Sequence, residues 1–492
     1  MVTMKRYTSI LIVTLAGLGA AGCNDFLSKA PDNRAQLDSK EKIAELLVTA
    51  YPEANYMTFC EAMSDNAEDN PSASKDARNA DPYFWRDGTS TEQDSPEFYW
   101  NGCYAAIAAA NHALRSIESK GDPSLYNDQK GEALVARAYS HFMLVSLFAK
   151  AYDANTAAGD AGIPFVTDPE TVSFKNYTRG TVQSVYDNIE KDRTEGLSLL
   201  NDQAYQSGSD ASGVASYHFT KAAAHAFATR FYLFKKDYEK VLEHANAVFP
   251  SGDFKDNMRP WNTTYKAYSA NELAATYTKS SENANLLLCE TLSDWANTFN
   301  SVEYATGASK YQEIFPNPTG AMYAFSTLYT SRGVYFVYKF KPHFVRTGTN
   351  ANTGYTYTVT PLFSTEEVLL SRAEAYAMTT RFHEAMADLN VWASTRITNY
   401  NAETDAVTYN KLYNYYHNNN NQEAIVSAVL DFRRVEFLHE GLRWFDILRH
   451  KLTVTHSTYD GVTEELKPGD PRRILQIPRE AVSLGGLDPN PR

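Results

Sequence analysis

The feature that most constrains this chain is the segment 431–449, in which charged and large apolar side chains are interleaved at helical spacing. Val435, Leu438 and Leu442 fall three and four positions apart, as residues on one face of a helix do. A helix on the protein surface has its apolar side chains on one face and its charged side chains on the opposite face. The order of residues in this segment does not allow that separation. We therefore predict that some of six charged residues in this segment are buried as ion pairs: Arg433, Arg434, Glu436, Glu440, Arg443 and Asp446.

Gly441 lies in the middle of this segment and predicts a break between two short helices. Glycine accepts the left-handed backbone conformation that ends many helices. The simplest interpretation of residues 431–449, which we call the latch, is structural, because removing one partner of a buried ion pair costs about 3–5 kcal/mol.

Length and charge narrow the class of protein. The chain has 492 residues, enough for a large domain or several packed layers. Its 46 Lys and Arg residues against 59 Asp and Glu residues give a formal net charge of −13. Nucleic acid is not expected as a partner, because phosphate binding needs a basic surface.

The N-terminus resembles a bacterial secretory signal. Lys5 and Arg6 precede an apolar run at 10–18, which is too short for a stable membrane-spanning helix. Small residues follow, and Cys23 comes directly after them in a pattern that resembles a lipobox. This resemblance implies that Cys23 is diacylated and becomes the mature N-terminus. Two acyl chains would then anchor the protein stably to a membrane. An ordinary cleaved signal with a chance cysteine is the alternative.

Helix signals recur along the chain. Ser95, Pro96 and Glu97 combine a capping hydroxyl, a proline at the first helical position and an acidic residue in the first turn. Ser364 and Glu367 form a capping box. The apolar periodicity predicts helix pairs near 95–150, 178–250 and 364–398.

Two of these helix pairs are similar to each other in sequence. Tyr232 and Tyr238 correspond to Tyr376 and Phe382, at the same separation along the chain. A helix rich in small and aromatic residues, a tight turn and a second helix resemble a tetratricopeptide pair. The copies do not repeat with a period of about 34 residues, so an isolated solenoid is not expected.

Three other regions predict irregular structure. Residues 52–94 contain Asp, Asn, Ser and Pro clusters typical of loops. Residues 251–362 combine Gly, Asn, Thr and Pro with scattered aromatic residues, and predict short strands at 286–289 and 334–338. The Asn-rich and Tyr-rich run at 409–422 favours a mobile surface loop.

The sequence carries no pattern of a known catalytic or metal site. It lacks a G-x-S-x-G elbow, a Walker A loop, a G-x-G-x-x-G turn and an H-E-x-x-H helix. Its four cysteines form no C-x-x-C. Residues 153–160 resemble a calcium loop only weakly, since the third oxygen ligand is missing. We predict no catalytic residue, metal or cofactor, and leave open a glycosidase carboxylate pair, whose spacing is three-dimensional.

Binding of a polar ligand remains as a candidate function. The chain contains 33 Tyr residues, and a sugar ring, with its apolar faces and polar rim, needs exposed aromatic rings beside polar groups. Trp100, Trp392 and Trp444 fall on helical stripes and are expected in the core. The candidate ligand contacts lie at 81–87 and between 255 and 340, with packing inside the protein as the alternative for each: Tyr83, Trp85, Trp261, Trp295 and Tyr311.

Three stretches together resemble the SusD/RagB family. The latch matches the family's C-terminal signature at Arg434, Glu436, Glu440, Gly441, Arg443, Trp444 and Asp446–Arg449. Cys23 with the acidic residue and Phe-Leu pair that follow is similar to the family's mature N-termini, and 474–480 resembles its terminal segment. The resemblance spans Cys23 to Arg492.

The resemblance implies a mainly α, SusD-like fold, with tetratricopeptide-like antiparallel helix pairs, long irregular loop insertions and a few short strands. The expected organisation is a signal peptide at 1–22, a lipidated tether at 23–38 and one domain at 39–492. Within this domain, 251–362 is the expected loop-rich insertion that faces the ligand.

The resemblance also implies a non-enzymatic lipoprotein at the outer surface of Bacteroidetes-type bacteria. Such a protein binds glycan and acts as the lid of a SusC-like, TonB-dependent transporter. The lipid on Cys23 would hold this protein at the outer membrane. The alternatives are an oligopeptide-binding subunit, as in the RagB branch, a surface glycoside hydrolase, and a tetratricopeptide-like assembly scaffold.

Overall fold

The computed structural model describes residues 37–170, 176–205, 215–348 and 353–492. The chain divides into two units, Met1–Ile43 and Ala44–Arg492. Apart from the start of helix α3, every element below belongs to the second unit. The predicted signal peptide and Cys23 lie outside the described residues.

Helices dominate the described residues, and the mainly α fold is confirmed. The helices are α3 (Lys40–Leu47), α4 (Met57–Met63), α5 (Ala77–Tyr83), α6 (Pro96–Glu118), α7 (Asn127–Phe148), α8 (Val182–Leu199), α10 (Lys221–Lys235), α11 (Tyr238–Val248), α12 (Ala270–Tyr277), α13 (Trp295–Thr298), α14 (Ala308–Ile314), α15 (Thr365–Met378), α16 (Phe382–Arg396), α17 (Tyr409–Tyr416), α18 (Asn421–Glu436), α19 (Leu442–His450) and α20 (Arg479–Ser483). The strands are β1 (Glu68–Asp69), β2 (Asn285–Leu292), β3 (Tyr304–Ala305), β4 (Thr327–Tyr329), β5 (Tyr335–Val337), β6 (Pro342–Arg346), β7 (Gly354–Ser364), β8 (Val454–Ser457) and β9 (Thr463–Leu466).

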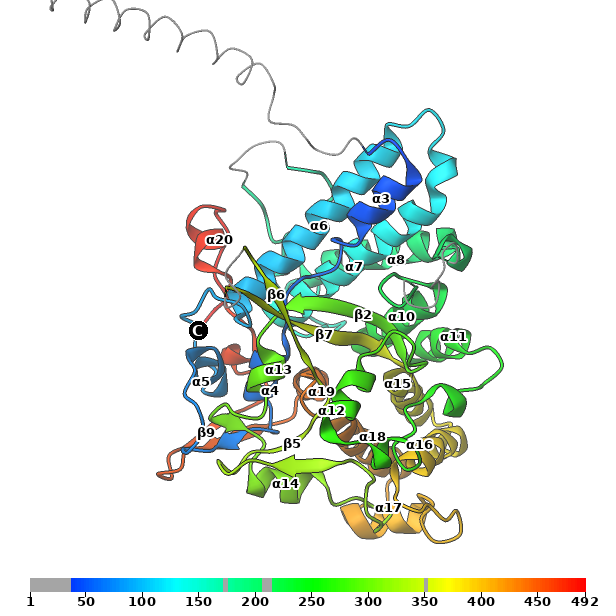
Figure 1. The fold of residues 1–492 in the computed structure, drawn as a ribbon, viewed down its shortest axis with the longest axis vertical. Coiled ribbons are helices and arrows are strands. Elements are labelled where there is room, and N and C mark those ends of the chain that lie inside the picture. Colours follow the sequence, from blue (N-terminus) through cyan, green and yellow to red (C-terminus); the bar gives the residue numbers. More distant parts are fainter. Residues whose placement is uncertain (1–36, 171–175, 206–214, 349–352) are drawn as a thin grey trace, which may run out of the picture. The chain divides into compact units, whose positions relative to one another are not determined.

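Paired helices occupy the regions where the sequence predicts them. Helix α6 packs against α7 and α7 against α8, while α10 pairs with α11 and α15 with α16 (Figure 1). Ser95 caps α6 by accepting a hydrogen bond from the Phe98 N–H at 3.2 Å, which satisfies a donor that the helix leaves free. Arg137 of α7 donates to both carboxylate oxygens of Asp192 on α8, at 2.7 and 2.9 Å, and so joins two helices through a buried ion pair.

The two helix pairs that are similar in sequence are also packed together, through α11 and α15. Arg230 of α10 donates to both carboxylate oxygens of Glu367 on α15, each at 2.6 Å. Arg372 of α15 pairs instead with Asp388 of its own partner helix α16, at 2.7 Å. Arginines of the two similar helix pairs therefore serve different contacts, one between the pairs and one within a pair.

Both of the strands that the sequence predicts are present in the structure. Strands β2, β7 and β6 form an antiparallel sheet in that order, and β4 pairs with β5 in a hairpin. Strand β2 covers the prediction at 286–289, and β5 lies within the prediction at 334–338, one residue shorter at each end. A second hairpin, β8 with β9, follows the latch.

The latch contains the buried ion pairs that its sequence predicts. Helix α18 ends at Glu436, α19 begins at Leu442, and Gly441 between them has φ = 73°. The pairs that involve the latch include Arg396 with Glu436 (2.7 Å), Lys339 with Glu440 (2.7 Å), Arg433 with Asp446 (2.8 Å), Arg443 with Asp65 (2.8 Å) and Arg449 with Glu374 (2.7 Å). The latch therefore binds segments from most of the chain to one another.

Two predictions of irregular structure are wrong. Residues 52–94 contain α4, whose seven residues are all buried and which packs against α19. The Asn-rich and Tyr-rich run contains α17, which Thr408 caps. Leu412 on this helix is buried, and Tyr416 donates to Asp431 of α18 at 2.7 Å. Tertiary contacts thus order segments whose composition alone is typical of loops.

Candidate functional site

Tyr83 and Trp85, two of the predicted ligand contacts, are buried. Tyr83 stacks against Tyr304 and His456, with ring centroids 4.1 and 4.0 Å away. Trp85 also stacks on His456, at 4.4 Å, and its indole N–H donates to the Met63 carbonyl at 3.0 Å. The expectation that these rings face solvent is wrong, because they hold the 81–87 segment against the β8–β9 hairpin.

Trp261 and Trp295 are buried as well. Trp261 packs edge to face against Phe325, with ring centroids 4.8 Å apart. The Trp295 indole donates to the carbonyl of His439 in the latch at 2.9 Å. The expectation of exposure is wrong here too. An insertion of short strands and loops buries apolar area mainly by turning its largest rings inward.

Tyr311 is the candidate that remains partly exposed, and it belongs to a series of stacked rings. It stacks on Tyr335 with centroids 4.7 Å apart and planes inclined by 25°. Tyr335 stacks in turn on Tyr329, at 5.7 Å and 27°. The ring centroids of Tyr311 and Phe315 also lie 4.3 Å apart, with planes inclined by 31°. We call these four residues the ring array.

Helix α14 and the β4–β5 hairpin position the ring array. Tyr329 and Tyr335 are cross-strand partners in the hairpin. The Tyr335 N–H donates to the Thr306 carbonyl at 2.7 Å, next to the start of α14. The Ser309 N–H donates to the Glu68 carboxylate at 2.9 Å, which fixes that end of the helix. The rings are therefore brought together by segments from several parts of the chain.

The ring array offers both apolar and polar groups at the surface. Tyr329, at one end, is 72% exposed. Among the described residues, no partner satisfies the hydroxyl groups of Tyr311, Tyr329 or Tyr335. Each hydroxyl can donate one hydrogen bond and can also accept hydrogen bonds. The array can therefore contact the apolar face of a ligand and its polar groups at the same time.

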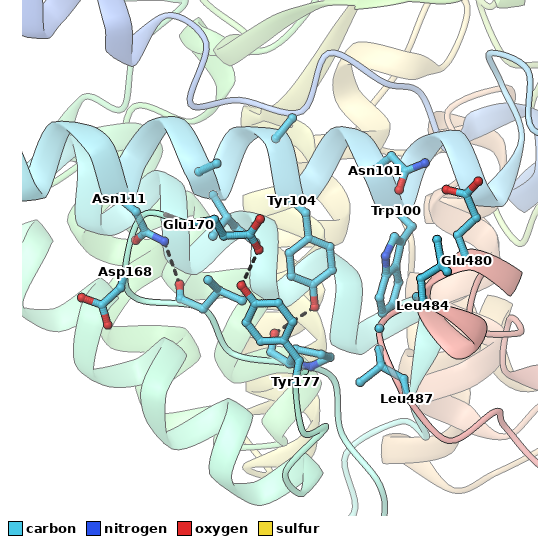
Figure 2. A pocket seen from close by; sticks show the side chains of 17 residues that line it. Trp100, Asn101, Tyr104, Asn111, Asp168, Glu170, Tyr177, Glu480, Leu484 and Leu487 are labelled. Atoms are coloured by element: carbon cyan, nitrogen blue, oxygen red, sulfur yellow. Dashed lines mark hydrogen bonds between the residues drawn. The ribbon is translucent and has the colours of Figure 1, made fainter. Parts of the chain in front are cut away.

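A pocket of about 500 Å³ lies beside α6 and shares no residue with the ring array (Figure 2). Helix α6, with Trp100 and Tyr104, forms one wall, and the residues at and just after α20 form another. The remaining described lining consists of Pro164, Val166, Asp168, Glu170 and Tyr177. The Tyr104 hydroxyl donates to the Pro164 carbonyl at 2.9 Å. Asn111 donates to the Val166 carbonyl at 3.1 Å. These two bonds hold the segment after Pro164 along the helix.

The charged side chains that line this pocket are acidic. Its described lining contains the carboxylates of Asp168, Glu170 and Glu480, and no Lys, Arg or His. Asp168 pairs with Arg115 at the rim, at 2.6 Å. Tyr177 donates its hydroxyl to Glu170, and burial together with this bond raises the pKa of Tyr177. The pocket can thus accept hydrogen bonds and favours a positive charge.

Trp100 is a site residue that the sequence prediction misses. It is 5% exposed, in agreement with the prediction that it packs in the core, yet its ring also forms a wall of the pocket (Figure 2). Its indole N–H has no acceptor among the described residues, and it is not among the polar atoms that are sealed from solvent. The available signal was the aromatic pair four positions apart in the first turns of α6.

Two carboxylates of the weak calcium-loop pattern form ion pairs with lysines. Asp153 pairs with Lys451 at 3.1 Å, and Asp160 pairs with Lys150. Within the described ranges, no group of three or more His, Cys, Asp or Glu side chains is arranged to hold a metal ion. Cys60, Cys103 and Cys289 are buried free thiols. In the same part of the chain, no helix combines the length and the apolar character needed to cross a membrane.

Comparison with protein families gives two matches. A family model described as "SusD family" matches residues 175–473. A model described as "Starch-binding associating with outer membrane" matches residues 25–233. A search of curated proteins finds no match.

Solved structures with a similar fold come from Bacteroides species. A SusD superfamily protein from Bacteroides thetaiotaomicron is 20% identical, with 92% of this chain and 100% of that chain covered and a TM-score of 0.68. A SusD-like carbohydrate binding protein from Bacteroides vulgatus is 17% identical, with coverages of 91% and 97% and a TM-score of 0.63. A SusD superfamily protein from Bacteroides fragilis is 17% identical, with coverages of 92% and 99% and a TM-score of 0.62. At these identities the similarity establishes the fold.

Proposed function

Because this chain belongs to the SusD family, we propose that it is a cell-surface protein that binds glycan without catalysis and delivers it to a SusC-type, TonB-dependent transporter. The observation that carries this proposal is the ring array, in which three stacked tyrosines with free hydroxyl groups lie beside Phe315. The lipid predicted on Cys23 would hold the protein at the outer membrane.

The geometry of the ring array suits a sugar better than a wholly apolar ligand. Sugar rings present C–H groups on their faces and hydroxyl groups around their edges. The exposed ring of Tyr329 can contact a sugar face, while the hydroxyls of Tyr311 and Tyr335 can bond to the sugar's edge. Stacking between the rings also restricts their motion, so little conformational entropy is lost when a ligand binds.

Binding of neutral oligosaccharides to the purified mature chain tests the proposal. We expect Tyr329→Ala to weaken binding by about fivefold, since an aromatic contact contributes about 1 kcal/mol. Tyr459→Ala is the matched control, because Tyr459 is 80% exposed at the β8–β9 tip and lies outside the array. Unchanged melting temperatures would show that both variants are folded.

Two results would overturn the proposal. Binding of oligopeptides by a protein that binds no member of a broad glycan panel would favour the peptide-binding alternative. Release of reducing ends from a polysaccharide by the pure protein would show that the chain is a glycoside hydrolase.

A further inference from the structure

The pocket beside α6 combines three kinds of group that few ligands satisfy together. Trp100, Tyr104 and Tyr177 supply aromatic walls, and the Trp100 indole supplies an N–H without a protein acceptor. Glu170 and Glu480 supply carboxylates. A ligand that fits this lining has apolar faces, a hydrogen-bond acceptor and a positive charge.

Four basic groups near this pocket are engaged elsewhere, and Arg479, which precedes Glu480 on α20, is exposed and does not line the pocket. Arg137 forms its ion pair with Asp192, and Arg115 forms its pair with Asp168. Arg179 donates to the Gly162 carbonyl and to the Asn490 side chain, each at 2.7 Å. His141 accepts the Val166 N–H at 3.0 Å, and burial lowers the pKa of His141 to about 3, so its ring is neutral. None of these four groups supplies a free cation that would compete with a cationic ligand.

A second pocket continues the first one across α6. Asn101 and Ala105, both exposed, line the two pockets. The second pocket, of about 750 Å³, contains Glu53 and Glu290, and its described lining has no Lys, Arg or His. Glu290 pairs with His343, which lies outside this lining, at 2.7 Å. Because both pockets adjoin this exposed part of α6, a ligand longer than one ring can contact the two acidic pockets at once.

We infer that these two pockets form a second glycan site, separate from the ring array, which binds oligosaccharides of amino sugars with free ammonium groups. This inference rests on the proposed function and adds the class of sugar. The aromatic walls contact the apolar faces of the sugar, the Trp100 N–H donates to a ring or hydroxyl oxygen, and the ammonium group bonds to Glu170 or Glu480. Uronic acids and sulfated sugars are disfavoured, because their charge has the same sign as the pocket.

Calorimetric titration of the mature chain tests this inference with three probes: glucosamine oligomers, N-acetylglucosamine oligomers and oligogalacturonate. We expect the glucosamine oligomers to bind about tenfold more tightly than the N-acetylated oligomers, through the charge-assisted bonds, and the oligogalacturonate to bind weakest. The double variant Glu170→Gln with Glu480→Gln should remove this preference. The matched control is Glu239→Gln with Glu403→Gln, which removes the same number of charges from exposed positions elsewhere.

A steric block separates this site from the ring array. Ala105→Trp places a large ring in both pockets from an exposed position, so it should abolish the preference for glucosamine without unfolding the chain. Tyr329→Ala should leave the preference unchanged. If Tyr329→Ala weakens neutral glycan binding while Ala105→Trp has no effect on any probe, the inference is wrong and the proposed function holds. The inference would also be overturned by a basic peptide that binds more tightly than glucosamine oligomers and whose binding is lost in the Ala105→Trp variant.

Discussion

Arg396 and Glu436 form a bidentate ion pair that is completely buried. The Arg396 Nε and Nη2 atoms donate to the two carboxylate oxygens of Glu436 at 2.7 and 2.8 Å. Arg396 also pairs with Glu366 at 2.9 Å, and Trp392 donates its indole N–H to Glu436 at 2.8 Å. This network joins α15, α16 and the latch, so the stability of the frame depends on it.

Glu436→Ala should lower the free energy of unfolding by about 3–5 kcal/mol, because it leaves the buried Arg396 without one carboxylate partner. Glu239→Ala is the control, since its pair with Arg381 is exposed and should contribute less than about 1 kcal/mol. Urea denaturation of both variants measures the difference. Equal losses would show that the buried network adds nothing beyond an exposed pair.

Gly441→Ala should destabilise the protein through the backbone and through packing. Gly441 has φ = 73°, and an added Cβ would lie 3.1 Å from both Cys60 Cβ and Met57 Cα. We expect a loss of about 1–3 kcal/mol. Gly461→Ala at the β8–β9 turn has a similar positive φ but open space around it, so it should cost less in the same denaturation experiment. A larger loss for Gly461→Ala would contradict the packing argument.

The buried carboxyl of Glu61 should make stability depend on pH. Burial raises the pKa of Glu61 to about 7, although the hydrogen bonds that its carboxylate accepts from the Gly441 N–H and the Asn66 side chain oppose the shift. The folded state therefore holds a proton that the unfolded state releases from about pH 4.5 upward. The stabilising contribution of this group is complete below about pH 4.5 and is lost as pH rises towards 7.

Glu61→Gln mimics the protonated carboxyl and should remove this dependence. At pH 5 the variant and the parent should have similar unfolding free energies. At pH 7.5 the variant should be relatively more stable, by an amount on the order of 3 kcal/mol. Urea denaturation across this pH range checks the prediction, and a constant difference between the two proteins would contradict it.

Trp261→Phe and Trp295→Phe should differ although both residues are buried. The Trp295 N–H donates to the His439 carbonyl, whereas the Trp261 N–H has no acceptor among the described residues. We expect Trp295→Phe to cost about 1 kcal/mol more, since it leaves a buried carbonyl without this donor. Thermal unfolding measures the difference, and neither variant should change glycan affinity directly, because both rings are sealed inside.

Cys23→Ala should abolish incorporation of labelled fatty acid and release the protein from the membrane fraction. Two acyl chains account for stable attachment, and the variant retains none of them if Cys23 is the acylated residue. Cys60→Ala is the control, because Cys60 is buried in the folded chain. Label that persists in the Cys23→Ala variant would show that processing occurs at another position.

The sequence determined the features that depend on neighbouring residues. The helix pairs follow from capping residues and apolar periodicity, as Ser95 and Ser364 illustrate. The buried charges of the latch follow from a segment whose charges and apolar groups cannot be separated onto two faces. The same local motifs sufficed for the family resemblance.

Only the tertiary structure decided which aromatic rings reach the surface. Trp85 is buried by His456, and Trp295 by contact with His439, each far away in the chain. Tyr311 stays at the surface because α14 and the β4–β5 hairpin stack their rings there. Exposure of a ring in a loop depends on which distant segment packs on it, and local composition carries no record of that partner.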